Sequence, residues 1–136
     1  WILTPHPGEA GRLLGLSAVA VQGDRPRALA ELARRYGGTV VLKGAGTLVH
    51  AKVGVPWICT YGNPGMASPG TGDVLAGLIG ALRAQGAAAF DAARAGVLVH
   101  ALAGDRAARN GERGMLAGDL LAEIRRFVNP AQGSLQ

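Results

Sequence analysis

Gly62-Asn-Pro-Gly-Met-Ala-Ser-Pro-Gly-Thr-Gly-Asp-Val-Leu-Ala-Gly77 is the stretch that decides the fold, because a loop rich in glycine and proline turns there directly into an apolar run. The apolar positions that follow the loop are Val74, Leu75, Leu78, Ile79 and Leu82. Their spacing predicts one buried face of a helix over 71–85, with Gly86 as its stop signal.

Residues 70–73, Gly-Thr-Gly-Asp, therefore lie where this helix begins. The first backbone N–H groups of a helix have no helical partner, and together with the helix dipole they form a site for an anion, most often a phosphate. Gly70 and Gly72 let a phosphate approach the backbone without interference from a Cβ atom. We therefore predict an anion hole made of Gly70, Thr71 and Gly72.

Asp73 admits two interpretations. Aspartate is a favoured helix cap, so the carboxylate can simply satisfy backbone N–H groups. A carboxylate beside an anion hole can instead take the proton from a hydroxyl group that attacks a phosphate. The four residues by themselves do not separate a cap from a general base.

Strand and helix patterns alternate in the first half of the chain and predict an α/β fold. The expected strands are 2–4, 39–43, 47–50 and 57–60, and the expected helices are 9–16, 25–36, 71–85, 91–109 and 116–128. The β-branched run at 39–43 is typical of a strand buried in a parallel sheet. No linker divides the chain, so we expect a single domain over 1–136, with 130–136 as a frayed tail.

Composition excludes several classes of protein. Of the 136 residues 49% are hydrophobic, which allows a core, and only 4% are aromatic, which favours packing through small side chains. The net charge of +5 comes from scattered arginines without interleaved aromatic residues, so we do not expect nucleic-acid binding. The single cysteine, Cys59, excludes an internal disulfide and suits a buried strand.

No segment reaches the length of a membrane span, and no signal peptide is recognisable, so we expect no membrane partner and a cytoplasmic location. The chain opens on Trp1 without an initiator methionine and is interpreted as part of something longer. No group of His, Cys, Asp and Glu has metal-ligand spacing, so no metal held by the protein is predicted.

Two further motifs carry candidate chemistry. In Thr4-Pro-His-Pro-Gly-Glu9, two prolines fix the loop around His6, which either bonds only to backbone or contacts a substrate. In Lys43-Gly-Ala-Gly-Thr47, a lysine leaves a strand into a glycine turn, where it either neutralises phosphate or stands exposed. His100 is interpreted as a satisfied core or interface histidine, and Asp105 and Asp119 as charges on helix surfaces.

The three motifs together resemble the ADP- or ATP-dependent NAD(P)H-hydrate dehydratases, which are similar to ribokinase-like kinases. The resemblance implies a ribokinase-like three-layer α/β/α sandwich. It assigns the general base to Asp73, substrate contacts to His6, Asn63 and Asp73, and nucleotide contacts to Gly72 and to Lys43, Gly44, Ala45, Gly46 and Thr47. ADP or ATP would be the phosphoryl donor, with Mg²⁺ held largely by phosphates and water.

The implied reaction is repair of hydrated NADH or NADPH by phosphorylation of the ring hydroxyl and elimination of phosphate. Two alternatives stay open: a ribokinase-like kinase of a small alcohol such as a sugar or vitamin precursor, and a non-catalytic nucleotide-binding module. The resemblance covers only the C-terminal half of the family's catalytic domain. We therefore expect that the chain by itself lacks activity and that its exposed surfaces favour a homo-oligomer.

Overall fold

The computed structural model describes residues 1–129, which form a four-stranded sheet in the order β1-β2-β3-β4. The strands are β1 (Ile2–Leu3), β2 (Thr39–Leu42), β3 (Thr47–Ala51) and β4 (Trp57–Cys59). Strand β1 is parallel to β2, whereas β2 with β3 and β3 with β4 are antiparallel. The prediction of a parallel-sheet strand at 39–43 is therefore right for only one neighbour, because the short turn after β2 returns the chain as a hairpin.

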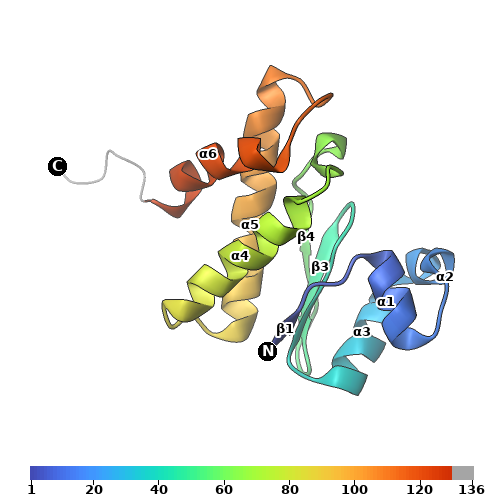
Figure 1. Cartoon of the computed structure of the whole chain (residues 1–136). Helices are drawn as coiled ribbons and strands as arrows, with labels where there is room; N and C mark the ends of the chain where they lie inside the picture. The colour runs from blue at the N-terminus through green and yellow to red at the C-terminus, as the bar shows by residue number, and fades with distance from the viewer. Residues whose placement is uncertain (130–136) are drawn as a thin grey trace.

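Helices cover both faces of this sheet (Figure 1). The helices are α1 (Pro7–Leu14), α2 (Ala18–Gly23), α3 (Arg25–Tyr36), α4 (Thr71–Ala84), α5 (Ala89–Ala107) and α6 (Ala117–Val128), with two short 3₁₀ helices, η1 (Pro64–Met66) and η2 (Ala108–Asn110). Helices α1, α2 and α3 lie on one face, and α4 and α5 lie on the other. The predicted three-layer α/β/α arrangement is therefore present.

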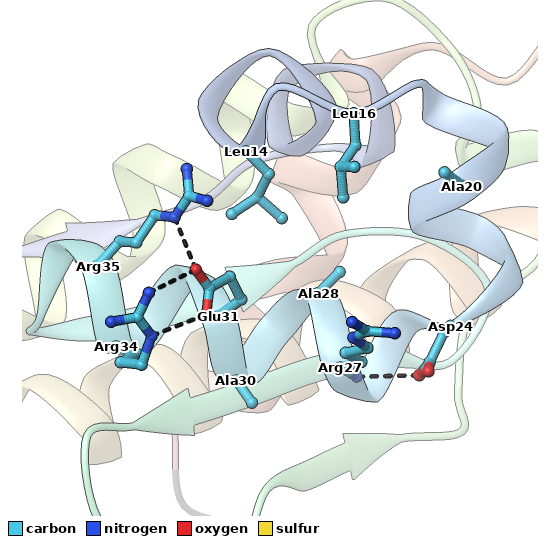
Figure 2. Close-up of a pocket in the computed structure, with 10 residues that line it drawn as sticks. All are labelled: Leu14, Leu16, Ala20, Asp24, Arg27, Ala28, Ala30, Glu31, Arg34 and Arg35. Atoms are coloured by element: carbon cyan, nitrogen blue, oxygen red, sulfur yellow. Dashed lines mark hydrogen bonds and ion pairs between the residues drawn. The ribbon is translucent and has the colours of Figure 1, made fainter.

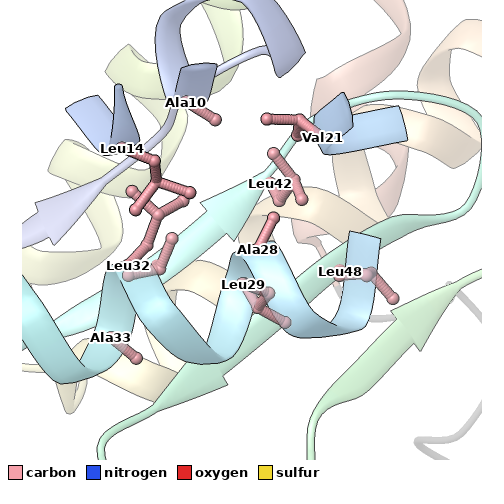
Figure 3. Close-up of a cluster of buried hydrophobic side chains, with 10 residues drawn as sticks. Ala10, Leu14, Val21, Ala28, Leu29, Leu32, Ala33, Leu42 and Leu48 are labelled. Carbon is pink, nitrogen blue, oxygen red and sulfur yellow. The ribbon is translucent and has the colours of Figure 1, made fainter. Parts of the chain in front are cut away.

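The alternation of side chains along β2 separates two cores. Val40 and Leu42 are fully buried against α1, α2 and α3, where Leu29 and Leu32 of α3 fill the centre (Figure 3). Val41 points to the opposite face. It packs there with a second cluster, which comprises Val49, Cys59, Leu75, Ile79, Ala93, Val97 and Ala101. The buried position predicted for Cys59 is confirmed.

Helix α6 belongs to a third, smaller cluster. It packs against α5 through Leu120, which is fully buried with Ala107 and Met115. Within residues 1–129, no helix is both long enough and apolar enough to span a membrane.

Helices α4 and α5 approach each other closely at a glycine. A Cβ atom on Gly96 of α5 would lie 2.6 Å from Cγ1 of Ile79 in α4, so only glycine fits without rearrangement. One turn further on, the buried His100 donates from Nε2 to the carbonyl oxygen of Thr71 at 2.9 Å. The interpretation of His100 as a satisfied core histidine is confirmed, and α5 thereby holds the first residue of α4.

Some element boundaries differ from the sequence prediction. Helix α1 begins at Pro7 rather than at residue 9, because the His6 side chain caps it and proline is well tolerated in the first turn. Helix α2 has no counterpart in the prediction, since its six residues are too few for a helical period to be recognised. Helix α5 starts at Ala89 rather than at residue 91. The predicted tail over 130–136 lies outside the described residues.

The Gly96 contact predicts an asymmetry between two helical glycines. Gly96→Val should lower the free energy of unfolding by about 1–3 kcal/mol, the usual cost of overpacking a core. Gly80→Val should be neutral or slightly stabilising, because Gly80 of α4 faces open space and glycine is a poor helix former. Urea unfolding of the two variants checks this, and equal stabilities would contradict the close packing of α4 on α5.

The burial of His100 predicts a pH dependence. Burial lowers the pKa of His100 below its ordinary value of 6.5, and the nearby Lys43 cation lowers it further. His100 has its ordinary pKa in the unfolded chain and a lower pKa in the folded chain. Between these two values the unfolded chain binds more protons than the folded chain, so stability is lost as pH falls below about 6.5. The slope from this one group cannot exceed about 1.4 kcal/mol per pH unit.

His100→Gln removes this titrating group, so its free energy of unfolding should fall less between pH 7.5 and pH 5.5 than that of the unchanged protein. Chemical denaturation at both pH values measures the difference. Identical pH dependence of the two proteins would show that His100 is not buried as a neutral imidazole.

Candidate active site

The N-terminus of α4 has the geometry that an anion hole requires. Gly70 is the N-cap in a left-handed conformation, with φ 88° and ψ −17°. The buried Thr71 hydroxyl lies 2.8 Å from the carbonyl oxygens of both Met66 and Ser68, which fixes the loop before the helix. In the described part of the chain, the N–H groups of Gly70 and Gly72 have no hydrogen-bond partner, whereas that of Thr71 donates to Ser68. Two donors therefore stay available for an anion.

Asp73 is not a helix cap. It is the third residue of α4, and the cap position makes no side-chain hydrogen bond. Its carboxylate is exposed, and within residues 1–129 it has neither an ion pair nor a hydrogen bond. The capping interpretation is wrong, because the Gly70 turn and the Thr71 hydroxyl already set the start of the helix. The Asp73 carboxylate therefore stays available for another role beside the predicted anion hole.

Lys43 brings two distant motifs together. Its backbone N–H donates to Pro5 at 2.9 Å, and its ammonium nitrogen lies 3.7 Å from a carboxylate oxygen of Glu9. The same nitrogen is 3.0 Å from the position that a Cβ atom on Gly72 would occupy. Any side chain at residue 72 would therefore crowd the lysine. The ammonium group lies between the loop around His6 and the N-terminus of α4.

The turn over 43–47 is held by Arg25, a residue that no sequence motif singles out. Arg25, at the start of α3, donates from Nη2 to the carbonyl oxygens of Leu42 and Gly46, both at 3.1 Å. The hydroxyl of Thr47 closes the turn on Gly44 at 3.0 Å. Burial lowers the pKa of the Arg25 guanidinium, whose charge faces two carbonyl dipoles. No local pattern predicts these contacts, because they join positions 17 and 21 residues apart.

His6 caps α1. Its Nδ1 accepts from the N–H groups of Gly8 at 3.0 Å and Glu9 at 3.3 Å, and a Glu9 carboxylate oxygen accepts from the His6 backbone at 2.7 Å. This is the backbone-bonding geometry that the sequence left open for His6. Because Nδ1 accepts, the neutral ring carries its proton on Nε2, 3.5 Å from the other Glu9 oxygen. Chiefly the His6 N–H, helped by Lys43, lowers the pKa of Glu9.

Asn63 is tied to α5. Its Nδ2 donates to Oδ1 of Asp105 at 3.0 Å, and its Oδ1 accepts from the N–H of Gly65 at 3.1 Å. The other Asp105 oxygen accepts from the N–H of Gly62 at 3.0 Å. The interpretation of Asp105 as a surface charge is wrong, because both of its oxygens hold the loop before α4. Asp119 is exposed, as predicted, and accepts from Leu116 at the start of α6.

A cavity of about 540 Å³ collects most of the predicted residues. Its lining includes the turn 43–47, the segment 59–64, Met66, Ala67, Thr71, Gly72, Leu75, Val97, His100 and Ala101. His6, Gly70 and Asp73 are not part of this lining. The cavity therefore unites the predicted nucleotide contacts with Asn63 and with two of the three predicted anion-hole residues, Thr71 and Gly72.

A second cavity, of about 650 Å³, lies between α1, α2 and α3 (Figure 2). None of the predicted residues lines it. Two of its arginines, Arg34 and Arg35, are bound to Glu31, and their hydrogen bonds lower the pKa of that carboxyl to about 2. The cavity of about 540 Å³ is the better candidate for the functional site, since most of the predicted site residues line it.

Within residues 1–129, no three His, Cys, Asp or Glu side chains are grouped closely enough to hold a metal ion. The donors at the candidate site are instead backbone N–H groups and the Lys43 ammonium. This set suits an anionic ligand.

Comparison with known proteins identifies the family of the chain. A profile of the Carb_kinase family, described as NAD(P)H-hydrate dehydratase, matches residues 1–126. The bifunctional NAD(P)H-hydrate repair enzyme Nnr of Coxiella burnetii is 53% identical over 131 residues, which cover 96% of this chain and 27% of that protein. The ADP-dependent (S)-NAD(P)H-hydrate dehydratase of Neisseria meningitidis is 44% identical over 130 residues, 94% of this chain and 44% of that protein. The chain thus spans less than half of the length of either relative.

Solved structures similar to this chain include an NAD(P)H-hydrate dehydratase and a ribokinase-like protein. The ADP/ATP-dependent NAD(P)H-hydrate dehydratase of Bacillus subtilis, co-crystallised with ATP and Mg²⁺, is similar with a TM-score of 0.85 and 30% identity, over 93% of this chain and 46% of that one. A ribokinase-like superfamily protein of Enterococcus faecalis is similar with a TM-score of 0.78 and 30% identity, over 95% of this chain and 45% of that one. The predicted ribokinase-like α/β fold is confirmed. The chain belongs to the NAD(P)H-hydrate dehydratase family.

Proposed function

We propose that the protein containing this chain dehydrates NADH or NADPH that carries a hydroxyl group on the nicotinamide ring, with ADP or ATP as phosphoryl donor. The observation that carries the proposal is the position of the Lys43 ammonium, between Glu9 beside His6 and the backbone of Gly72. A cation there attracts the phosphates of a nucleotide toward two free N–H groups. Family membership supports the choice of substrate.

Hydroxide is a poor leaving group, and the proposed reaction replaces it with phosphate, which leaves the ring more readily. In the first step, the ring hydroxyl oxygen bonds to the terminal phosphorus of the nucleotide, the bridging P–O bond breaks, and Asp73 takes the hydroxyl proton. In the second step, the ring nitrogen's electron pair expels phosphate as the C–O bond breaks. A proton leaves the neighbouring ring carbon, which restores the dihydropyridine.

The described residues have distinct roles in this scheme. The N–H groups of Gly70 and Gly72, with Thr71 fixing their geometry, hold the phosphoryl group as charge develops on it. Lys43, Gly44, Ala45, Gly46 and Thr47, together with Gly72, seat the nucleotide. His6 offers its Nε2 proton to the hydrated ring. Asn63 already uses its carbonyl oxygen and one N–H, so it contacts substrate through its remaining N–H.

Mg²⁺ fits this site only as the companion of the nucleotide. The described residues supply no cluster of carboxylates, so phosphate oxygens and water would be its main ligands. The B. subtilis relative was co-crystallised with ATP and Mg²⁺, and the N. meningitidis relative is named ADP-dependent. We propose that either nucleotide is accepted. The expectations of a homo-oligomer, and of inactivity of these 136 residues alone, stay predictions.

We expect the protein containing this chain to convert hydrated NADH into NADH, with free phosphate released, when ADP or ATP is present. Asp73→Asn should lower turnover by about a hundredfold or more, the order expected for loss of a general base. The fold should be unaffected, because the carboxylate makes no cap hydrogen bond. NADH absorbance and phosphate release measure the reaction.

Asp91→Asn is the matched control, since Asp91 is likewise the exposed third residue of a helix and lies away from the cavity. It should leave turnover unchanged. Near-normal turnover of Asp73→Asn would remove Asp73 from the role of base. A stable phosphoester in place of NADH would identify the protein as a kinase, and no nucleotide-dependent product at all would favour a binding module.

Lys43→Ala should weaken ADP or ATP binding by roughly 1.5–3 kcal/mol, the usual value of a hydrogen bond between charged groups. Its effect on the hydrated nicotinamide substrate should be smaller. Calorimetric titration checks the nucleotide affinity. Lys52→Ala removes an exposed lysine from the loop after β3 and should bind normally. Equal affinity of the two variants would show that Lys43 makes no contact with phosphate.

A further inference from the structure

We propose that Asp105 of α5 is a positioning residue for the nucleotide site: its carboxylate holds the loop 62–68 in the shape that forms the cavity wall and presents the anion hole. This inference rests on the proposed function for the identity of the ligand. It concerns a residue that never touches the reacting atoms, and it assigns to α5 a part in binding that its sequence does not suggest.

Both oxygens of Asp105 are committed to one loop. Oδ2 accepts from the backbone N–H of Gly62, and Oδ1 accepts from Nδ2 of Asn63, each at 3.0 Å. Gly62 has φ 107°, a left-handed conformation that favours glycine and aims its N–H at α5. Within residues 1–129, Asp105 has no ion pair, since the adjacent Arg106 pairs with Glu123. The charge of Asp105 is therefore used entirely to orient two donors.

The contact continues to the anion hole. Asn63 passes the constraint to Gly65 through its own carbonyl oxygen, and Met66 then packs against α5 at Gly104, where a Cβ atom would collide with the Met66 sulfur. The carbonyl oxygen of Met66 accepts from the Thr71 hydroxyl at 2.8 Å. Each link joins the next by a hydrogen bond or by direct packing. Movement of the loop at Asn63 would therefore also displace Thr71 at the start of α4.

The loop also borders the ligand space directly. Gly62, Asn63 and Met66 line the same cavity as the turn 43–47. Loss of the two Asp105 hydrogen bonds would let the loop 62–68 move relative to the turn 43–47. Since phosphate contacts depend on donors held in fixed positions, the loss should appear in nucleotide affinity rather than in global stability alone.

The first variant is Asp105→Asn. The amide can still accept from Gly62, but it presents N–H to N–H at Asn63, so the loop loses one hydrogen bond and gains a repulsion. We expect ADP and ATP to bind about tenfold or more weakly by calorimetric titration. Asp119→Asn is the matched control, because Asp119 likewise accepts a backbone N–H at a helix start but lies on α6. It should bind nucleotide normally.

The decisive variant exchanges the pair, Asn63→Asp with Asp105→Asn. All three hydrogen bonds can then form again: residue 105 accepts from Gly62 and donates to residue 63, which accepts from Gly65. We expect this double variant to regain most of the lost nucleotide affinity, which a merely damaged structure would not do. Normal affinity of Asp105→Asn overturns the proposal, and so does a folded double variant that binds as weakly as the single one.

The exchange also separates this inference from the proposed function. The readout is binding of ADP or ATP, which requires no hydrated NADH. If Asp105→Asn fails to fold, the double variant still decides by its affinity. If the unchanged protein binds ADP but never converts hydrated NADH, the proposed reaction fails while the role of Asp105 in nucleotide binding stands.

Discussion

A single ammonium group organises the candidate site. The Lys43 nitrogen lies 3.7 Å from the Glu9 carboxylate and against the backbone of Gly72. A partly buried charge needs compensation, and Glu9 provides it as a carboxylate that the His6 N–H already holds in its ionised form. Glycine at 72 leaves the room that the lysine occupies. Three loops from distant parts of the chain are consequently arranged around one cation.

Helix α5 supports this arrangement from behind. It contributes no predicted site residue, yet its buried His100 bonds to the first residue of α4 and its Asp105 binds the preceding loop. Gly96 lets α5 approach α4 closely enough for the first of these contacts. The small residues of α5 thus allow close helix packing, and none of them takes part in the proposed reaction. Packing without large side chains, which the composition favoured, brings the polar groups of α5 within hydrogen-bonding distance of α4 and its loop.

Two aspartates illustrate one physical point. Asp73 matches a capping residue by type, but it is the third residue of α4, and no side chain makes a cap hydrogen bond there. Asp105 matches an ordinary surface charge by its place in a helix, but it faces two donors on a loop 42 and 43 residues away. Residue type gives hydrogen-bonding capacity, whereas the partner depends on which segments the fold brings together.

Local patterns in the sequence were sufficient for the helix start at 70–73, the strands 39–42 and 47–51 with their glycine turn, and the burial of Cys59 and His100, because periodicity and glycine placement act over a few residues. The motifs also sufficed to recognise the family. Only the tertiary structure decided that β2 runs antiparallel to β3, that Lys43 meets Glu9, and that Arg25 and Asp105 hold the loops. The contacts of Lys43, Arg25 and Asp105 join residues 17 to 43 positions apart, and their energies depend on distances that no short-range pattern encodes.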